Sequence, residues 1–335
     1  MADLRPVTEV QAADAAALDH QLRTAKAPFV VRGLVADWPL VQAAKRSSQA
    51  ARDYLVERHR DVPFTVSVGQ AGGGERLFYD DAMAMNFATV RAKLPEILGE
   101  MGRVEQDADP RAIYLASIDM RGFFDGLEEA NRVDLGTREP LASIWIGTRT
   151  RIAAHNDLPD NLACVAAGRR RFTLFPPDQF RNLHLGPLDN TPAGRAVSMV
   201  DFTAPDAERH PRFAEALAHA QVAELEAGDA IHIPGLWWHH VEGLAPFNIL
   251  VNYWWRDAPR WFGQPQDALH HALLAIRDLP PEQKEHWREV FDHYVFTNDD
   301  SVTAHIPPGG RGVLDPLTAE SAGRLRAFLL RQLAK

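Results

Sequence analysis

The stretch SIWIGTRTRIAAHNDLPDNLACVAAGRRRFTLF, residues 143–175, decides the fold of this chain. In this stretch, short apolar runs are separated by turns that contain Gly, Pro and Asp, a pattern that indicates strands. The same pattern extends from Ile113 to Trp255, where one helix is expected at about 211–219. Many short strands at close spacing predict a mainly β fold, a sandwich or barrel such as the double-sheet jelly roll. The expected strands are Ile113–Ser117, Ser143–Thr148, Leu162–Ala166, Arg170–Phe175, Val222–Glu226, Ala230–Ile233 and Phe247–Trp254.

The segments on either side of these strands have a different pattern. Upstream, we expect an Ala- and Leu-rich helix at about 10–23, a strand at 28–31, a helix capped by Ser47 or Ser48, and a strand at 64–68. Downstream, helices are expected at 267–277, 281–294 and 318–333, the last with an apolar stripe. The chain is therefore divided into N-terminal α/β elements that pack on the barrel (1–110), the barrel (111–257) and a C-terminal helical region (258–335).

The composition limits the classes of partner. The chain has 335 residues, 46% of them hydrophobic, so a substantial core can form. A formal net charge of −9 argues against nucleic acid or an anionic membrane as the main partner, although it leaves room for a local basic patch. Cys164 is the only cysteine, which rules out intramolecular disulfides. With neither an N-terminal signal pattern nor an apolar run of membrane-spanning length, a soluble, cytoplasmic protein is expected.

His155 and Asp157 form the first candidate for chemistry. Two residues apart on an extended strand, their side chains point to the same side. A third histidine from a distant strand would complete a set of two histidines and one carboxylate, which suits non-haem Fe(II) and leaves positions open for O₂ and a cosubstrate. His239 and His240 are adjacent and face opposite ways on a strand, so only one can join, and periodicity does not choose between them. His232 is a competitor that we interpret as structural or as a support of the site.

Three polar side chains lie in otherwise apolar strands and are candidates for contact with a bound ligand. Arg170 shares a face with Phe172 and Leu174, where a cation is costly unless it is paired. It could hold a ligand carboxylate through two parallel hydrogen bonds, or form an internal ion pair with an Asp or Glu. Asn161 and Asn252 are isolated amides that could bond either to the backbone or to the same cosubstrate.

These residues belong to a longer series of motifs that resembles the JmjC/cupin-like oxygenases dependent on Fe(II) and 2-oxoglutarate, in particular the asparaginyl-hydroxylase subgroup and its bacterial cupin-like relatives. The resemblance is close over roughly residues 110–257 and looser toward both ends, and it is specific because several motifs recur in order at matching spacing. The motifs are His155-Asn156-Asp157, Asn161, Gly168-Arg169-Arg170-Arg171-Phe172, Leu174-Phe175-Pro176-Pro177-Asp178-Gln179-Phe180, Gly228-Asp229, Ile233-Pro234, Trp237-Trp238-His239-His240-Val241-Glu242 and Val251-Asn252-Tyr253-Trp254.

The resemblance implies a double-stranded β-helix with Fe(II) bound by His155, Asp157 and His239, which excludes His240. It also implies O₂ and 2-oxoglutarate as cosubstrates, the latter chelating the iron through its keto acid. The C-terminal helices resemble a dimerisation element, so a homodimer is expected. The residues that the resemblance implies for cosubstrate binding are Arg170, where these enzymes usually have a lysine, with Tyr114, Asn161, Asn252 and Trp254.

Departures from the family pattern limit what is carried over. Ile152 stands where the family's animal member has a threonine, and Arg170 adds bulk and a planar fork relative to lysine. Pro159 and the loop after Phe180 do not reproduce the peptide-binding residues. We therefore expect an Fe(II)- and 2-oxoglutarate-dependent dioxygenase that hydroxylates an unidentified substrate, a protein side chain, a peptide or a small molecule. Two alternatives stay open: a metal-dependent cupin enzyme that does not use 2-oxoglutarate, and a cupin that binds without catalysis.

Overall fold

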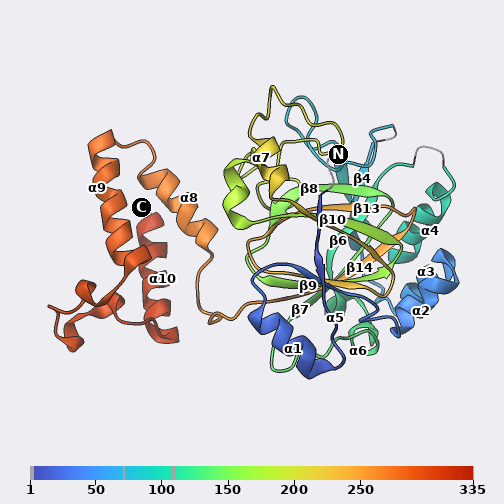
Figure 1. Cartoon of the computed structure of the whole chain (residues 1–335), viewed down its shortest axis with the longest axis horizontal. Helices are drawn as coiled ribbons and strands as arrows, with labels where there is room; N and C mark the ends of the chain where they lie inside the picture. Colours follow the sequence, from blue (N-terminus) through green and yellow to red (C-terminus); the bar gives the residue numbers. More distant parts are fainter. Residues whose placement is uncertain (1–3, 71, 108–109, 335) are drawn as a thin grey trace. The chain divides into compact units, whose positions relative to one another are not determined.

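The computed structural model describes residues 4–70, 72–107 and 110–334. Residues 1–3 belong to the N-terminal segment in which a signal pattern was sought, and they lie outside the described residues. The chain divides into two compact units, Met1–Arg256 and Asp257–Lys335. The first unit holds the strands, and the second is built from helices and turns (Figure 1).

Two sheets form the centre of the first unit. One sheet has five strands in the order β1-β11-β10-β13-β8, and the other has nine in the order β2-β3-β12-β9-β14-β7-β6-β4-β5. All neighbouring strands are antiparallel except the pairs β1–β11 and β2–β3. The strands are β1 Arg5–Pro6, β2 Thr8–Glu9, β3 Phe29–Val31, β4 Phe64–Gly69, β5 Phe87–Ala92, β6 Ile113–Asp119, β7 Leu141–Gly147, β8 Thr150–Asn156, β9 Asp160–Ala167, β10 Arg169–Phe175, β11 Gln221–Glu226, β12 Ala230–Ile233, β13 Trp238–Gly243 and β14 Asn248–Trp255.

The inner faces of the two sheets share one apolar core. Phe172 and Leu174 of β10 belong to the same buried cluster as Val165 of β9, Ile233 of β12 and Leu250 of β14. Side chains alternate between the two faces of a strand, so every second residue of these strands contributes to this core. The arrangement is an antiparallel double-sheet jelly roll, which confirms the predicted fold class.

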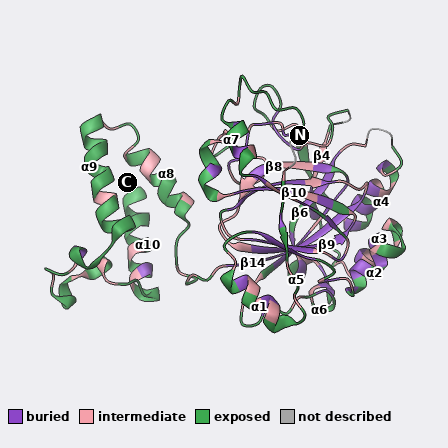
Figure 2. Cartoon of the chain, in the orientation of Figure 1, coloured by how far each residue is buried: buried purple, intermediate pink, exposed green. Residues whose placement is uncertain are grey.

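Helices cover the outer face of the nine-stranded sheet. Leu40 of α2, Leu55 of α3 and Leu98 of α4 pack in one cluster with Ile144 of β7 and other residues of the sheet. Strand β9 is buried on both faces, which explains its nearly continuous apolar sequence. Figure 2 shows this buried centre and the exposed outer sides of the helices. The helices are α1 Ala15–Thr24, α2 Pro39–Arg46, α3 Ser48–Val56, α4 Leu94–Val104, α5 Met120–Phe123 and α6 Leu127–Ala130.

The connection between β10 and β11, residues 176–220, covers the outer face of the five-stranded sheet. It contains a 3₁₀ turn at Pro177–Arg181 and the short helix α7, Phe213–Ala218. Phe202 and Phe213 of this connection are buried in one cluster with Phe175 of β10 and Trp238 of β13. Because it packs on the strands that carry the candidate ligands, this connection helps to position the site.

The seven strands expected from apolar runs are all present, with ends that differ by a few residues. Ser47 caps α3 by accepting a hydrogen bond from the Ala50 backbone N–H at 3.0 Å, one of the two caps expected from the sequence. Strands β8 and β13 were not among the strands expected from apolar runs, although the face argument for the candidate histidines assumed an extended backbone there. Their sequences, TRIAAHN and WHHVEG, are rich in polar residues, so they lack the apolar run by which the other strands were recognised.

The second unit contains α8 (Pro265–Ala275), α9 (Pro281–Phe291) and α10 (Ala319–Leu333). Within the described residues of this unit, Val302 and Ala322 are the only buried hydrophobic side chains. No helix in the described part of the chain is long and apolar enough to cross a membrane.

Candidate active site

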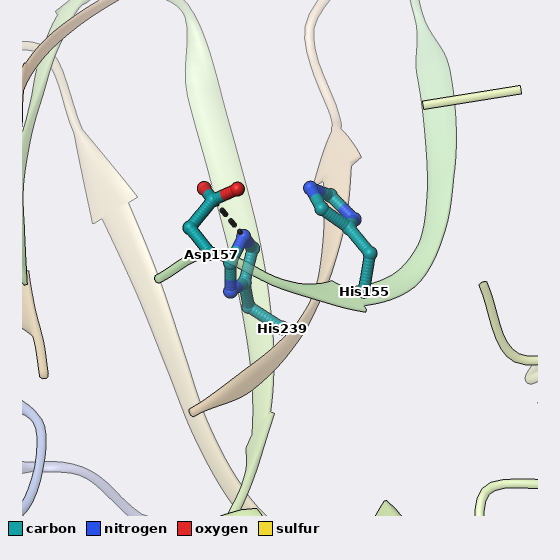
Figure 3. Close-up of side chains that lie close together, drawn as sticks. All are labelled: His155, Asp157 and His239. Atoms are coloured by element: carbon teal, nitrogen blue, oxygen red, sulfur yellow. Dashed lines mark ion pairs between the residues drawn. The ribbon is translucent and has the colours of Figure 1, made fainter. Parts of the chain in front are cut away.

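His155, Asp157 and His239 come together where β8 ends and β13 begins (Figure 3). One potential ligand atom from each residue lies within 4.8 Å of the others. The Nε2 atom of His239 is 3.7 Å from a carboxylate oxygen of Asp157, and the two imidazole centroids are 4.4 Å apart. Two nitrogen ligands and one carboxylate on one side of a metal form the set that non-haem Fe(II) enzymes use.

Strand pairing produces this cluster. His155 is the penultimate residue of β8, and His239 is its register partner on β13. Asp157 follows the end of β8, so it is not a strand residue as the alternation argument had assumed. The Leu236 backbone N–H donates to the Asp157 carbonyl oxygen at 2.7 Å, which ties the turn before β13 to the end of β8.

Backbone hydrogen bonds orient both imidazole rings. Nδ1 of His155 lies 2.9 Å from the Ala153 carbonyl oxygen, and Nδ1 of His239 lies 3.0 Å from the Trp237 carbonyl oxygen. A carbonyl oxygen can only accept, so each Nδ1 carries the proton and each Nε2 presents its lone pair. Burial lowers the pKa of His239 to about 4, with a further lowering from His155 and an opposing effect from Asp157. His239 is therefore neutral at pH 7, the form that binds metals.

The structure places the other two candidate histidines outside the cluster. His240 points to the outer face of its sheet, where it stacks on Phe202 with ring centroids 4.4 Å apart. His232 is fully buried, with Nε2 3.7 Å from Asp160 Oδ1 and its ring stacked on Trp255. Neither residue belongs to the group that could hold a metal ion.

A cavity of about 330 Å³ adjoins the three candidate ligands, between the two sheets. Arg170 of β10 lines it and is 1% exposed, and its Nε and Nη2 atoms have no hydrogen-bond partner among the described residues. Burial lowers the pKa of its guanidinium, and burial raises the pKa of the Tyr114 phenol beside it. Of the described residues that line the cavity, Asp157 alone carries a carboxylate. A buried cation without an anionic partner is costly, so this cavity suits a ligand that brings its own carboxylate.

The remaining predicted residues line the same cavity. Asn252 donates to the Asn161 side-chain oxygen at 2.9 Å, which leaves the Asn252 side-chain oxygen without a partner among the described residues. Trp254 contacts Trp145 edge to face, with centroids 5.8 Å apart, and Trp145 in turn lies beside Tyr114. The amide pair supplies polar groups, while the aromatic row forms a wall that limits the entry of water.

Several residues at or near the site were not anticipated from the sequence. Arg195, in the connection between β10 and β11, places Nε 3.7 Å from Asp157 Oδ1. Pro192, Ala193 and Val197 of the same connection line the cavity. No sequence signal marked these residues, because they lie in an irregular segment whose place is set only by tertiary packing.

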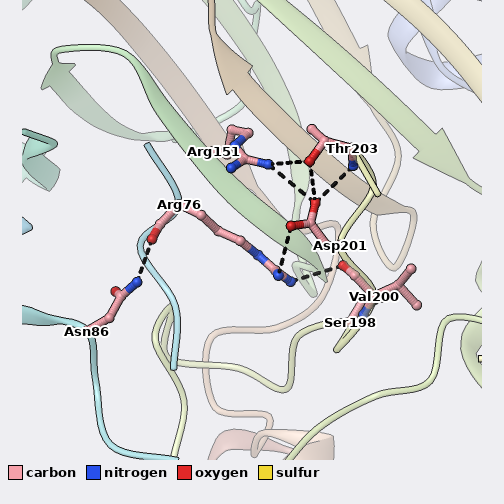
Figure 4. Close-up of polar contacts among 7 residues, drawn as sticks. All are labelled: Arg76, Asn86, Arg151, Ser198, Val200, Asp201 and Thr203. Carbon is pink, nitrogen blue, oxygen red and sulfur yellow. Dashed lines mark hydrogen bonds and ion pairs between the residues drawn. The ribbon is translucent and has the colours of Figure 1, made fainter. Parts of the chain in front are cut away.

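A polar cluster fastens that connection to the jelly roll (Figure 4). Asp201 lies 3.3 Å from Arg151 of β8 and 3.7 Å from Arg76, and the Arg76 guanidinium donates to the Val200 carbonyl oxygen at 3.0 Å. Burial alone would raise the pKa of Asp201, but hydrogen bonds from Thr203 and the two arginines lower it below its ordinary value. The cluster holds the wall of the cavity against the strand that carries His155.

Comparison with known proteins gives one family and several curated relatives. A family model described as a cupin-like domain matches residues 15–260. The lysine-specific demethylase JMJ31 of Arabidopsis thaliana is 31% identical over 165 residues, 45% of this chain and 29% of that protein. The tRNA wybutosine-synthesizing protein 5 of Mus musculus is 32% identical over 146 residues, 39% of this chain and 43% of that protein. HSPB1-associated protein 1 of Homo sapiens is 30% identical over 138 residues, 40% of this chain and 27% of that protein. The matches span less than half the length of these relatives.

Proposed function

The chain belongs to the cupin-like domain family, and from this premise we propose that it is an Fe(II)- and 2-oxoglutarate-dependent dioxygenase that hydroxylates a substrate still to be identified. The family match agrees with the resemblance stated from the sequence motifs. The relatives' names refer to different substrates, a lysine-specific demethylase and a tRNA wybutosine-synthesizing protein, so they do not select one for this chain.

The buried guanidinium of Arg170 is the observation that carries this proposal. It lies in the same cavity as the three candidate metal ligands and has two nitrogen atoms without a partner among the described residues. 2-Oxoglutarate is a dicarboxylate, so one end can chelate a metal while the other pairs with a guanidinium through two parallel hydrogen bonds. A cupin that used its metal without any carboxylate ligand in this cavity would leave the cost of burying Arg170 without a counterpart.

Each residue then has a role in the reaction. His155, Asp157 and His239 would hold Fe(II) and leave the remaining positions open. With 2-oxoglutarate and O₂, the bound iron supplies the oxidation of a substrate C–H bond. Arg170, with the Tyr114 hydroxyl beside it, would neutralise and orient the far carboxylate of 2-oxoglutarate. Other lining residues complete the pocket: Asn161 and Asn252 offer hydrogen bonds to the bound cosubstrate, and Trp254 keeps water from that end.

Cosubstrate turnover and binding test the proposal. Loaded anaerobically with Fe(II) and then exposed to air, the protein should convert 2-oxoglutarate to succinate, slowly when no substrate is present. Titration of the iron-loaded protein with 2-oxoglutarate should produce a visible charge-transfer band. Arg170→Ala should weaken this binding, whereas Arg171→Ala should leave it unchanged, because Arg171 lies on the other face of β10 and pairs with Glu224 and Glu242. An iron-loaded protein that gives no band and no succinate would instead favour a metal-dependent cupin that does not use 2-oxoglutarate.

We also propose that the second unit mediates a homodimer. Its exposed large hydrophobic side chains include Leu274, Phe296 and Leu330, at 78%, 74% and 64% exposure. So much exposed apolar surface on helices with few buried residues calls for a partner surface, and a second copy of the chain is the partner expected from the sequence. Light scattering should give the mass of two chains, and Phe296→Glu with Leu330→Glu should give the mass of one. A monomeric wild type would reject the dimer.

A reducing compartment such as the cytoplasm is the location that we propose. Cys164 is the only cysteine of this chain, so the fold uses no intramolecular disulfide, which is usual for proteins of a reducing compartment. Fractionation of the cells that express the protein tests this location directly.

A further inference from the structure

A second cavity lies in the connection between β10 and β11. It has a volume of about 530 Å³ and is open to solvent, and we call it the arginine cavity. It shares no lining residue with the cavity of the candidate active site. Its lining residues are Phe180, Arg181, His184, Leu185, Met199, Arg209, His210 and Arg212.

The arginine cavity has an unusual charge for this chain. Three arginines and two histidines line it, and no carboxylate is among its described lining residues, although the whole chain has a formal net charge of −9. Like charges that converge on one concavity repel each other, and an anion bound between them removes that cost. Partial burial and the neighbouring Arg212 and His210 lower the pKa of His184, which agrees with a positive potential in the cavity.

Hydrogen bonds hold two of the basic side chains, those of His184 and Arg212, in defined positions. His184 has a left-handed backbone with φ 48°, and its Nε2 accepts a hydrogen bond from the Arg212 backbone N–H at 3.3 Å. Since Nε2 accepts, Nδ1 of the neutral ring carries the proton and is a donor. The Arg212 guanidinium donates to the Arg181 carbonyl oxygen at 2.8 Å, which fixes it at the rim. Nδ1 of His210, whose ring centroid is 5.2 Å from that of His184, is buried without a partner among the described residues.

We propose that the arginine cavity binds the phosphate group of a nucleotide. Guanidinium groups match phosphate oxygens with paired, charge-assisted hydrogen bonds, and the histidines add further donors. Phe180 lines the same cavity and is 44% exposed, with the Arg181 guanidinium 5.3 Å from its ring centroid. An exposed aromatic ring beside arginines offers a surface on which a base can stack. The overall negative charge argued against nucleic acid as the main partner, but this cavity is a local exception to it.

Titration calorimetry with AMP, inorganic phosphate and adenosine tests the proposal on the full-length protein. AMP should bind more tightly than inorganic phosphate, and adenosine should not bind. Removing two charge-assisted contacts in the double variant Arg181→Ala/Arg209→Ala should weaken AMP binding at least about tenfold. The matched control is Arg46→Ala/Arg103→Ala, which removes the same charge from exposed positions on α2 and α4 and should bind AMP as the wild type does.

The role of the ring is tested by Phe180→Leu, which should weaken AMP but not inorganic phosphate. Titration with a short single-stranded RNA shows whether the nucleotide is free or part of a polymer. If the RNA binds more tightly than AMP, the natural ligand is a polymer; if it binds more weakly, the ligand is a free nucleotide. Three results would overturn the proposal: no AMP binding at millimolar concentration, equal binding by the double variant and the wild type, or equal binding of inorganic phosphate and AMP. The test does not depend on iron or on 2-oxoglutarate, so its failure leaves the proposed dioxygenase activity untouched.

Discussion

Replacing Arg170 with methionine should stabilise the protein in the absence of 2-oxoglutarate and abolish its stabilisation by 2-oxoglutarate. Arg170 is 1% exposed, and its Nε and Nη2 atoms have no hydrogen-bond partner among the described residues. An unpaired buried donor costs about 1–3 kcal/mol, so these two cost roughly 2–6 kcal/mol in the folded state. Methionine is flexible enough to fill the space without a charge, and lost packing offsets part of the gain. We expect the free energy of unfolding to rise by about 2–4 kcal/mol.

Urea unfolding under anaerobic conditions, with Fe(II) and with or without 2-oxoglutarate, measures both effects. The free energy of unfolding of the wild type should rise by about 2.7 kcal/mol when 2-oxoglutarate is present at about 100 times its dissociation constant. Arg170→Met should gain nothing at the same concentration. The control Arg171→Met removes an arginine with 32% side-chain exposure from its ion pairs with Glu224 and Glu242. Its free energy of unfolding should fall by only about 0–1 kcal/mol, and 2-oxoglutarate should stabilise it as much as it stabilises the wild type.

Two results would refute this reasoning. If Arg170→Met is less stable than wild type without 2-oxoglutarate, the guanidinium is not an unpaired charge in the folded protein. If the variant gains as much from 2-oxoglutarate as wild type does, the cosubstrate carboxylate does not bind at Arg170. The second result would also remove the observation on which the proposed function rests.

Three further predictions concern the strands and turns that build the site. In the matched variants His239→Leu and His240→Leu, metal analysis should show loss of Fe(II) from the first and retention in the second; equal loss would contradict the assignment of His239. Burial lowers the pKa of His240 to about 3, so its contribution to stability is complete above pH 6.5 and is lost as the pH falls toward 3. The free energy of unfolding should therefore fall less in His240→Leu than in wild type between pH 7 and pH 4.5, by about 2–3 kcal/mol. Equal falls in the two proteins would show that His240 is not buried as a neutral ring. Gly235→Ala would bring a Cβ atom to 2.5 Å from the Leu158 carbonyl oxygen. Thermal unfolding should therefore show a free energy of unfolding lower by about 1–3 kcal/mol, together with weaker metal binding. An unchanged melting temperature would mean that this turn can shift freely.

The apolar strands could be predicted because their pattern has a local cause. A strand buried on both faces, such as β9, needs apolar residues at nearly every position, and its neighbours are marked by turn residues. The two strands that carry the candidate ligands, β8 and β13, lack this pattern because polar residues interrupt their sequences, and in β13 two of the buried positions hold histidines. The strands that carry the candidate ligands are therefore the ones with the weakest hydrophobic pattern.

The sequence by itself determined a mainly β architecture and the set of residue types from which a metal site could be built. It also showed that only one of His239 and His240 could join His155 and Asp157, because neighbours on a strand face opposite ways. The family resemblance selected His239 of the two, and the tertiary structure supplies the physical reason, since the pairing of β13 with β8 sets His239 opposite His155. Tertiary structure also decided that the buried Arg170 has no carboxylate partner among the described residues and that an irregular connection forms one wall of the cavity. Alternation and apolar runs act between neighbours in the chain, whereas partners, cavities and walls depend on segments that only the packing of the two sheets brings together.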